Sequence, residues 1–311
     1  MERGLGSTVC LAAPLNISAS KPSMIYGYHL AFSNELQDEH TPNTIKISPS
    51  DFIDSSTCFN IQVYQNNQEK NVTLATDRVF DKPEIGQKWF FQVEDTIEFM
   101  WETQSGKISY RFLAEATEDI FRFWLYHIVL PIYFSIGEVY KFLHAGAVEI
   151  EDKSVLFMAP SHGGKSTLTD YFIQRGHPLI TDDKMATFER EGVYYAVPAH
   201  PYHRPFRTVE VLGHLCENPS TQIHPIHAIY ILEKSAPDAQ ITIRTLKGIE
   251  KFSRLHEGGE MNFSFFTPQY VSYLAGLANR VNVFAITVPH DLERLKEVYT
   301  VITNHTLQLQ G

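Results

Sequence analysis

The chain has few cysteines, and Cys10, Cys58 and Cys216 are the three it contains among 311 residues. An odd number of widely spaced cysteines does not make a disulfide framework and is typical of reduced thiols in a cytosolic protein. The first residues also lack the layout of a signal peptide, in which a basic segment precedes an apolar one. We therefore expect a cytoplasmic protein.

The sequence also lacks a basic block. It carries 26 lysines and arginines against 36 aspartates and glutamates, for a net charge of −10. Nucleic-acid binding leaves an electrostatic footprint of clustered lysine and arginine, and no such cluster stands out. We therefore expect no nucleic-acid partner, and a phosphate site here must be made positive locally.

No apolar run is long enough to suggest a membrane span. Residues 120–136 come nearest, but Arg122, His127 and Pro131 interrupt them. A bilayer span needs about 20 largely uncharged residues. We expect instead two buried helical pieces, with Pro131 opening the second, and no membrane partner.

The length of the chain favours two domains over one large one. Short strand-like segments separated by polar turns fill the first part, which predicts a β-rich N-terminal domain over residues 1–115 and a second domain over 116–311. The predicted strands of the first part are residues 26–32, 44–47, 59–64, 72–75, 89–93, 97–101 and 107–113.

The most informative segment is residues 159–167, Ala-Pro-Ser-His-Gly-Gly-Lys-Ser-Thr. An apolar run, residues 154–158, predicts a buried strand before it, and residues 168–175 have helical spacing after it. A glycine-rich turn between a strand and a helix that opens with Lys-Ser is the context of a P-loop, in which backbone N–H groups hold phosphates. The alternative is a chance turn before a helix.

A carboxylate pair, Asp182 and Asp183, follows the next apolar pair, Leu179 and Ile180. In an open α/β sheet, ligands bind outside the carboxyl ends of the strands, where the glycine-rich turn also lies. One carboxylate can hold Mg²⁺ while its neighbour accepts a proton from a hydroxyl. The alternative is that both aspartates cap a turn.

Three blocks make the chain resemble the HPr serine kinase/phosphorylase C-terminal domain and related stand-alone kinases, including lasso-peptide kinases. They are residues 143–148 with His144, the glycine-rich turn, and residues 175–183, Arg-Gly-His-Pro-Leu-Ile-Thr-Asp-Asp. The resemblance covers about residues 120–300. It implies an α/β fold with a P-loop, phosphoenolpyruvate-carboxykinase-like core.

The resemblance also implies roles for single residues. Lys165 would bind phosphate, Asp183 would be the general base, and His144 would line the same site. Ser166 and Asp182 would belong to the Mg²⁺ shell, with Glu210 as a further metal ligand. The nucleotide-binding residues, with ATP as cofactor, would be Ser161, His162, Gly163, Gly164, Lys165, Ser166 and Thr167.

The sequence departs from this family at three places. Ala159 and His162 stand where the loop usually has glycines, and His162 is expected to carry strain of about 1–3 kcal/mol in a glycine conformation. Around Glu210 only this residue and Gly213 of the family's signature remain, which leaves a reverse phosphorylase activity in doubt.

Two arginines, Arg204 and Arg207, are further catalytic candidates because guanidinium groups bind phosphates and stabilise transition-state charge. The prolines of residues 198–207 predict an extended surface segment, whose alternative role is ordinary solvated ion pairing. A zinc site at His200 and His203 is disfavoured, since no second ligand pair lies nearby.

Together these features predict an ATP-dependent kinase that phosphorylates a hydroxyl, with a serine of a peptide or small protein as the favoured acceptor. The alternatives are a small-molecule kinase and a nucleotide-binding regulator without catalysis. The β-rich part would dock a peptide through an exposed sheet edge, and a homo-oligomer is what the resemblance implies.

Overall fold

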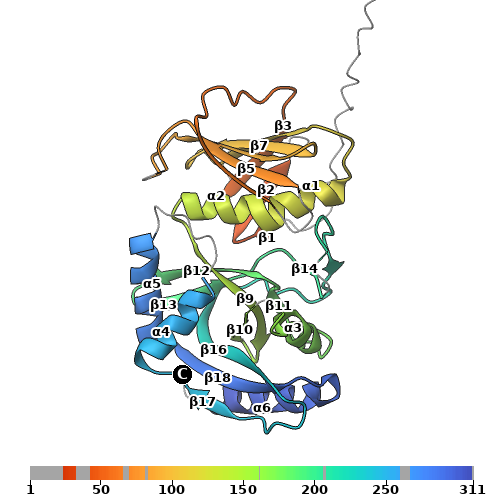
Figure 1. The fold of residues 1–311 in the computed structure, drawn as a ribbon, viewed down its shortest axis with the longest axis vertical. Coiled ribbons are helices and arrows are strands. Elements are labelled where there is room, and N and C mark those ends of the chain that lie inside the picture. Colours follow the sequence, from red (N-terminus) through yellow and green to blue (C-terminus); the bar gives the residue numbers. More distant parts are fainter. Residues whose placement is uncertain are drawn as a thin grey trace, which may run out of the picture.

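The protein combines two large sheets with helices in a mixed α/β architecture (Figure 1). The computed structural model describes residues 24–32, 43–65, 70–80, 83–160, 162–205, 208–259 and 267–309. Within this part, each sheet has eight strands. The first sheet comes from the N-terminal third of the chain, and the second from the remainder.

The first sheet has the order β1-β2-β3-β8-β7-β6-β5-β4. The pairs β2–β3 and β3–β8 are parallel, and the other neighbours are antiparallel. The seven strands predicted for this region are confirmed, with shifts of a few residues at their ends, and a short strand that was not predicted, β1 (Met24–Ile25), precedes them. The predicted seven are β2 (Tyr28–Phe32), β3 (Thr44–Pro49), β4 (Asn60–Gln65), β5 (Asn71–Thr76), β6 (Lys88–Val93), β7 (Ile97–Glu102) and β8 (Lys107–Phe112).

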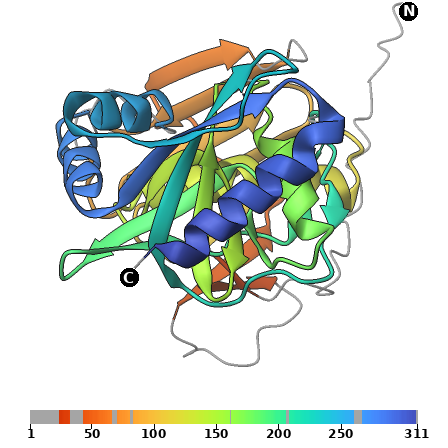
Figure 2. The same cartoon turned by 90° about the horizontal axis from the view of Figure 1, so that it is seen from below.

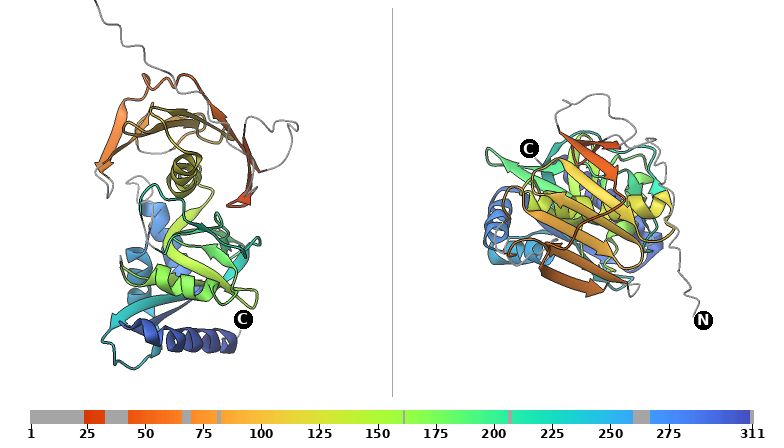
Figure 3. Two further views of the ribbon diagram at one scale, coloured as in Figure 1. Left: turned by 90° about the vertical axis from the view of Figure 1, so that its right-hand side faces the viewer. Right: turned by 90° about the horizontal axis from the view of Figure 1, so that it is seen from above.

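A continuous helical rod lies under this sheet and consists of α1 (Glu118–Trp124), η2 (Leu125–Val129) and α2 (Leu130–Ile136). The side chain of Thr117 caps its N-terminus by accepting a hydrogen bond from the Ile120 N–H at 3.3 Å. Pro131 stands in the first turn of α2, as predicted, but α2 continues directly from η2, so the two expected helical pieces form one rod. The left view of Figure 3 looks along the rod and shows the sheet curved over it.

Aromatic side chains join the rod to the sheet. Phe99 of β7 and Phe121 of α1 are fully buried and stack with ring centroids 6.0 Å apart. The apolar residues 120–136 are therefore core, as expected. The predicted boundary between residues 115 and 116 separates this rod from the sheet that it packs against, and that boundary remains a prediction.

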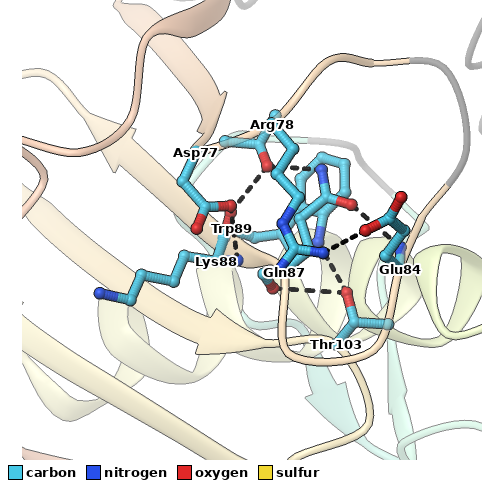
Figure 4. A network of polar contacts seen from close by, with 8 residues as sticks. Asp77, Arg78, Glu84, Gln87, Lys88, Trp89 and Thr103 are labelled. Atoms are coloured by element: carbon cyan, nitrogen blue, oxygen red, sulfur yellow. Dashed lines mark hydrogen bonds and ion pairs between the residues drawn. The ribbon is translucent and has the colours of Figure 1, made fainter.

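A polar network closes one end of the first sheet (Figure 4). The buried Gln87 side chain donates to Thr76 Oγ1 at 2.7 Å, and the indole N–H of Trp89 donates to Thr103 Oγ1 at 2.9 Å. The Lys88 N–H donates to Asp77 Oδ1 at 3.0 Å. Buried polar groups here have partners, so the large Trp89 ring is buried without an unsatisfied donor.

The second sheet has the order β10-β9-β12-β13-β16-β18-β17, with β11 beside β9. Its strands β10, β16 and β18 are parallel neighbours. A two-stranded ladder of β14 (Tyr202–His203) and β15 (His214–Leu215) stands apart. The sheet contains β9 (Lys141–Ile150), β10 (Lys153–Met158), β11 (Leu179–Thr181), β12 (Lys184–Arg190), β13 (Val193–Val197), β16 (His224–Ser235), β17 (Ile243–Thr245) and β18 (Asn282–Pro289).

Helices cover both faces of this sheet (Figure 2). One face packs on α3 (Lys165–Ile173) and α6 (Leu295–Gln308), which follows the short η4 (Leu292–Arg294). The other packs on α4 (Gly248–Glu257) and α5 (Thr267–Arg280). Alternate residues of β10 enter the two cores, which explains why this strand is apolar throughout.

The two sheets meet around Tyr26. Its ring lies edge-on to Phe134 of the rod and to Phe142 of β9, at centroid distances of 5.6 and 5.5 Å. Its hydroxyl donates to the Lys184 carbonyl at 3.3 Å, and the Tyr140 hydroxyl donates to the Tyr26 carbonyl at 2.9 Å. One hydrophobic core therefore contains residues of the first sheet, the rod and the second sheet.

No helix in the described ranges is both long and apolar enough to cross a bilayer. Two of the three cysteines fall in these ranges, and both Cys58 and Cys216 are free thiols. Cys216 is buried, and Cys58 is half-buried.

Candidate functional site

The glycine-rich turn connects β10 to α3, so the predicted order of strand, turn and helix is confirmed. Gly164 caps the helix with a left-handed φ of +90°. Gly163 has no room for a side chain, because a Cβ there would lie 2.6 Å from Ala159 Cβ and 2.8 Å from the Pro160 carbonyl oxygen. Ser161 lies outside the described residues. Two glycines thus let the chain turn tightly enough to point the first N–H groups of α3 outward.

His162 has the strained backbone expected for it. Its φ is +60°, in the left-handed region that glycine adopts readily and other residues adopt at a cost. Its exposed side chain lines the cavity beside the turn.

Lys165, His144 and Asp183 form a contiguous chain from the turn to the neighbouring strands. Lys165 Nζ lies 2.7 Å from His144 Nε2, and His144 Nδ1 lies 2.9 Å from Asp183 Oδ1. Because an ammonium group has no acceptor, Nε2 must accept the lysine's hydrogen bond, which leaves the ring proton on Nδ1. Three of the predicted catalytic residues are therefore brought together.

The main chain around Asp183 is held from two sides. The Ala145 N–H of β9 donates to the Asp183 carbonyl at 2.9 Å. The next carbonyl, that of Lys184, accepts from Tyr26 of the first sheet. Burial and the nearby charge of Asp183 raise the pKa of Tyr26, so its hydroxyl keeps the proton that it donates. The first sheet thus helps to position the carboxylate pair.

Asp182 is buried and faces the segment that carries Arg204. The Arg204 N–H donates to Asp182 Oδ2 at 2.9 Å. The His203 ring lies between two carboxylates, with Nε2 3.5 Å from Asp182 Oδ1 and Nδ1 3.5 Å from Asp170 Oδ1. Asp182 is therefore connected to α3 through His203, although sequence reasoning did not assign His203 a role.

The segment around Arg204 is buried, and the predicted surface position is wrong. His200, His203 and Arg204 are between 4% and 8% exposed because they pack beneath the helical rod. The His127 and His200 rings meet edge-on at 4.1 Å, and the Arg204 guanidinium lies 5.2 Å from the Phe123 ring centroid. The periodicity of the rod indicated a buried face but not what would cover it. Arg207 lies outside the described residues.

Two histidines of this cluster are neutral. Burial, together with the charge of Arg204, lowers the pKa of His200 to about 3. Burial, together with the nearby charge of Arg204, likewise holds the pKa of His127 well below its usual range. A neutral imidazole can pack against apolar rings at little cost, whereas its charged form cannot.

Glu210 makes its contacts with the first sheet and the rod. Its Oε1 accepts from Lys70 Nζ at 2.7 Å and from the Trp124 indole N–H at 3.1 Å. Within the described ranges, no three His, Cys, Asp or Glu side chains gather in the manner of a metal centre. Mg²⁺ with a nucleotide needs only one or two protein carboxylates, since phosphates and water supply the rest. The metal-ligand roles of Ser166, Asp182 and Glu210 remain predictions.

A cavity of about 260 Å³ opens beside the turn. One wall is the turn itself and the first residues of α3, with Thr167 at its edge. The other wall comes from the ends of β16 and β18 and from the start of α6, which sequence reasoning did not assign to the site. The lining residues are His162, Gly163, Gly164, Thr167, Leu168, Lys234, Val288, Pro289, His290, Asp291, Leu292 and Leu295.

Comparisons with known proteins add little to this geometry. No protein-family model matches the chain, and no curated protein matches it. The solved structure of the HPr(Ser) kinase/phosphatase from Coxiella burnetii is similar with 19% identity and a TM-score of 0.35, over 55% of this chain and 99% of that chain. A TM-score this low does not establish a shared fold.

Proposed function

We propose that this protein is a kinase that transfers the γ-phosphate of ATP to a hydroxyl group, with Mg²⁺. The observation that carries the proposal is the contact chain from Lys165 through His144 to Asp183, with distances of 2.7 and 2.9 Å. It connects a phosphate-binding type of loop to a carboxylate that can accept a proton. Phosphoryl transfer needs little more from a protein than such positioning and charge neutralisation.

The residues around the turn fit a nucleotide's phosphates. The N–H groups at the start of α3 and the Lys165 ammonium are the positive groups, in a chain of net charge −10. Ser166, the second residue of α3, and Asp182 would hold Mg²⁺. Bound ATP and Mg²⁺ would supply the phosphoryl group and neutralise its charge. When a nucleotide binds, Lys165 Nζ would leave His144 Nε2 and donate a hydrogen bond to a phosphate oxygen instead.

Asp183 would take the proton from the acceptor hydroxyl. His144, whose Nδ1 lies 2.9 Å from Asp183 Oδ1, would help to hold that group in place. Asp182, held by the Arg204 N–H, would stay ionised beside the metal. Arg204 acts in this scheme through its main chain, and its side chain packs on Phe123.

A serine of a peptide or small protein is the acceptor that we propose. Its support is the edge strand β4, where Ile61 and Val63 are more than half exposed. An extended peptide can pair with such an edge. We therefore assign the first sheet to substrate docking and residues 116–311 to catalysis, and we expect a homo-oligomer from the family resemblance.

The test is phosphate transfer from ATP with Mg²⁺, measured by mass spectrometry on a pool of serine-containing peptides and small hydroxyl metabolites. Asp183→Asn should lower the rate by about 10²–10⁴-fold, because a general base contributes that much. Its affinity for ATP should change little. Asp152→Asn is the matched control, since Asp152 is exposed in the turn between β9 and β10.

The outcome names the function. A phosphorylated peptide, absent with Asp183→Asn, supports a serine kinase, and a phosphorylated metabolite would replace the acceptor that we propose. Turnover by Asp183→Asn at the wild-type rate would contradict the assignment of the base. Tight ATP binding without transfer to any acceptor would make the protein a nucleotide-binding regulator instead.

A further inference from the structure

The cavity beside the turn has a second wall whose apolar side chains phosphate binding does not need. We propose that this cavity holds the base and ribose of the phosphate donor, with Asp291 binding the ribose hydroxyls and Leu292 covering the base. The donor is then a nucleoside triphosphate, and pyrophosphate and inorganic polyphosphate are poor donors. This inference rests on the proposed function and specifies its donor site.

The topology places the cavity where α/β sheets bind ligands. The parallel strands β10, β16 and β18 end at Met158, Ser235 and Pro289, on the same edge of the sheet. The turn that follows β10 and the turn that follows β18 face each other across the cavity. Ligands bind outside the carboxyl ends of parallel strands, so the location fits a nucleotide that extends from one turn to the other.

The second wall is largely apolar. Val288, Pro289 and Leu295 line this wall, and Leu292 at its rim is 75% exposed. Phosphate groups gain nothing from such a wall, whereas the flat face of a base is removed from water by it. A leucine left this exposed beside an apolar cavity is expected where a ligand covers it.

The polar groups of the second wall have different charges and suit different parts of a nucleotide. Asp291 Oδ1 accepts from the Glu293 N–H at 2.9 Å, which fixes the direction of the carboxylate as the cap of η4. Its Oδ2 accepts no hydrogen bond from the residues that the structure describes, so it can accept from a ribose hydroxyl. Lys234 lies on the same cavity and carries the charge that phosphate oxygens need.

The main chain of this wall is fixed. The His290 N–H donates to the Ser235 carbonyl at 3.0 Å and joins the ends of β16 and β18. The Asp291 N–H donates to the Pro289 carbonyl at 2.8 Å. Asp291 and Leu292 therefore stand on a rigid turn, and their side chains can be changed without moving the strands.

The test compares the binding of Mg-ATP and of Mg-tripolyphosphate to the full chain by titration calorimetry. Wild type should bind ATP at least about 10-fold more tightly, because tripolyphosphate makes no use of Asp291 or of the apolar side chains of the second wall. Asp291→Asn should weaken ATP binding about 10-fold through a lost charged hydrogen bond, and Leu292→Ala about 3- to 5-fold through lost apolar contact. Neither should change tripolyphosphate binding by more than about 2-fold.

Controls and variants separate the donor site from the proposed function. Asn caps a helix as well as Asp, so Asp291→Asn keeps η4 intact. Asp51→Asn and Leu307→Ala change exposed residues that do not line the cavity, and both variants should bind the two ligands as wild type does. Lys165→Met should lower the affinity for both ligands.

The remaining outcomes would contradict either the donor site or the proposed function. Equal affinity for ATP and tripolyphosphate in wild type, with Asp291→Asn and Leu292→Ala unchanged, would overturn the donor site and leave the kinase assignment standing. If neither ligand binds, or if Lys165→Met changes neither, the proposed function fails and this inference fails with it.

Discussion

The two sheets differ in how their strands neighbour one another, and this difference explains where the site lies. In the first sheet most neighbours are antiparallel, so turns alternate between its two ends. In the second, β10, β16 and β18 are parallel, and the loops at their carboxyl ends lie together. Polar and charged side chains from separate segments can therefore meet at one edge of the second sheet.

The first sheet takes part in the site through contacts with the second. Tyr26 supports the carbonyl that follows Asp183, and Lys70 holds Glu210 on the loop that follows Arg204. The shared core around Tyr26, Phe134 and Phe142 makes the two parts one body. The comparison thus separates a supporting sheet from one that carries the candidate site residues.

The largest effect is expected from the core under the first sheet. Phe99→Ala should destabilise the protein by about 3–5 kcal/mol, because a buried ring is lost and a cavity remains. Since the core is shared, urea unfolding should stay a single transition when followed by tryptophan fluorescence and by circular dichroism. Two separate transitions would show that the sheets are independent units. Phe52→Ala, at an exposed phenylalanine, is the control.

The second largest effect is expected on the rate of phosphate transfer, which should depend on a lysine of α3 and not on one of the first sheet. Lys165→Met should lower phosphate transfer by about 10²–10³-fold, as expected for loss of a positive group at the developing charge. Its melting temperature should stay near that of wild type. The same change at Lys88 of the first sheet should leave the rate unaltered. Equal losses at both positions would contradict the division of roles.

The third effect is a pH dependence of stability. Both buried histidines have folded pKa values below their unfolded values, so unfolding takes up protons and stability falls as the pH falls below about 6.5. For His200, with a pKa of about 3, the loss between pH 7 and pH 5 should be about 2 kcal/mol.

Urea titrations at pH 7 and pH 5 measure this loss. His200→Asn should be less stable at pH 7 but should lose about 2 kcal/mol less than wild type on acidification. His29→Gln, in the first sheet, serves as the control. If His200→Asn and wild type lose the same unfolding free energy between pH 7 and pH 5, His200 does not take up a proton on unfolding.

The smallest effect is expected at the strained turn. His162→Gly should stabilise the protein by about 0.5–1 kcal/mol, since relief of the left-handed strain exceeds the added chain entropy of glycine. Asp95→Gly, at φ +51° in the first sheet, should gain less stability, because aspartate adopts the left-handed conformation more readily than most residues. Thermal melts measure both. A loss of stability in His162→Gly would show that its side chain holds the turn.

Local patterns were sufficient for the strands of the first sheet and for the glycine-rich turn. The strand segments of the first sheet are short and rich in apolar residues, and polar turns end them, so their positions follow from neighbours in the chain. The loop of residues 159–167 was recognisable because its glycines, Lys165 and Ser166 are consecutive. The grouping of Lys165, His144 and Asp183 came from a family resemblance, and the structure brings the three into contact.

Other features depend on residues far apart in the chain, and no local pattern contains them. Burial of Arg204 and His203 required the rod of residues 118–136 to lie above them, and the prolines nearby indicated only an extended chain. Asp291 joined the phosphate loop, well over a hundred residues away, because β10 and β18 are both parallel to β16.

The sequence by itself thus determined most of the secondary structure and the glycine-rich turn between β10 and α3, since both follow from backbone geometry and short-range periodicity. The tertiary structure alone decided which side chains share that loop's cavity and which charges lie buried. Those depend on the order in which strands pair, and hydrogen bonding between strands leaves that order open until the whole core is packed.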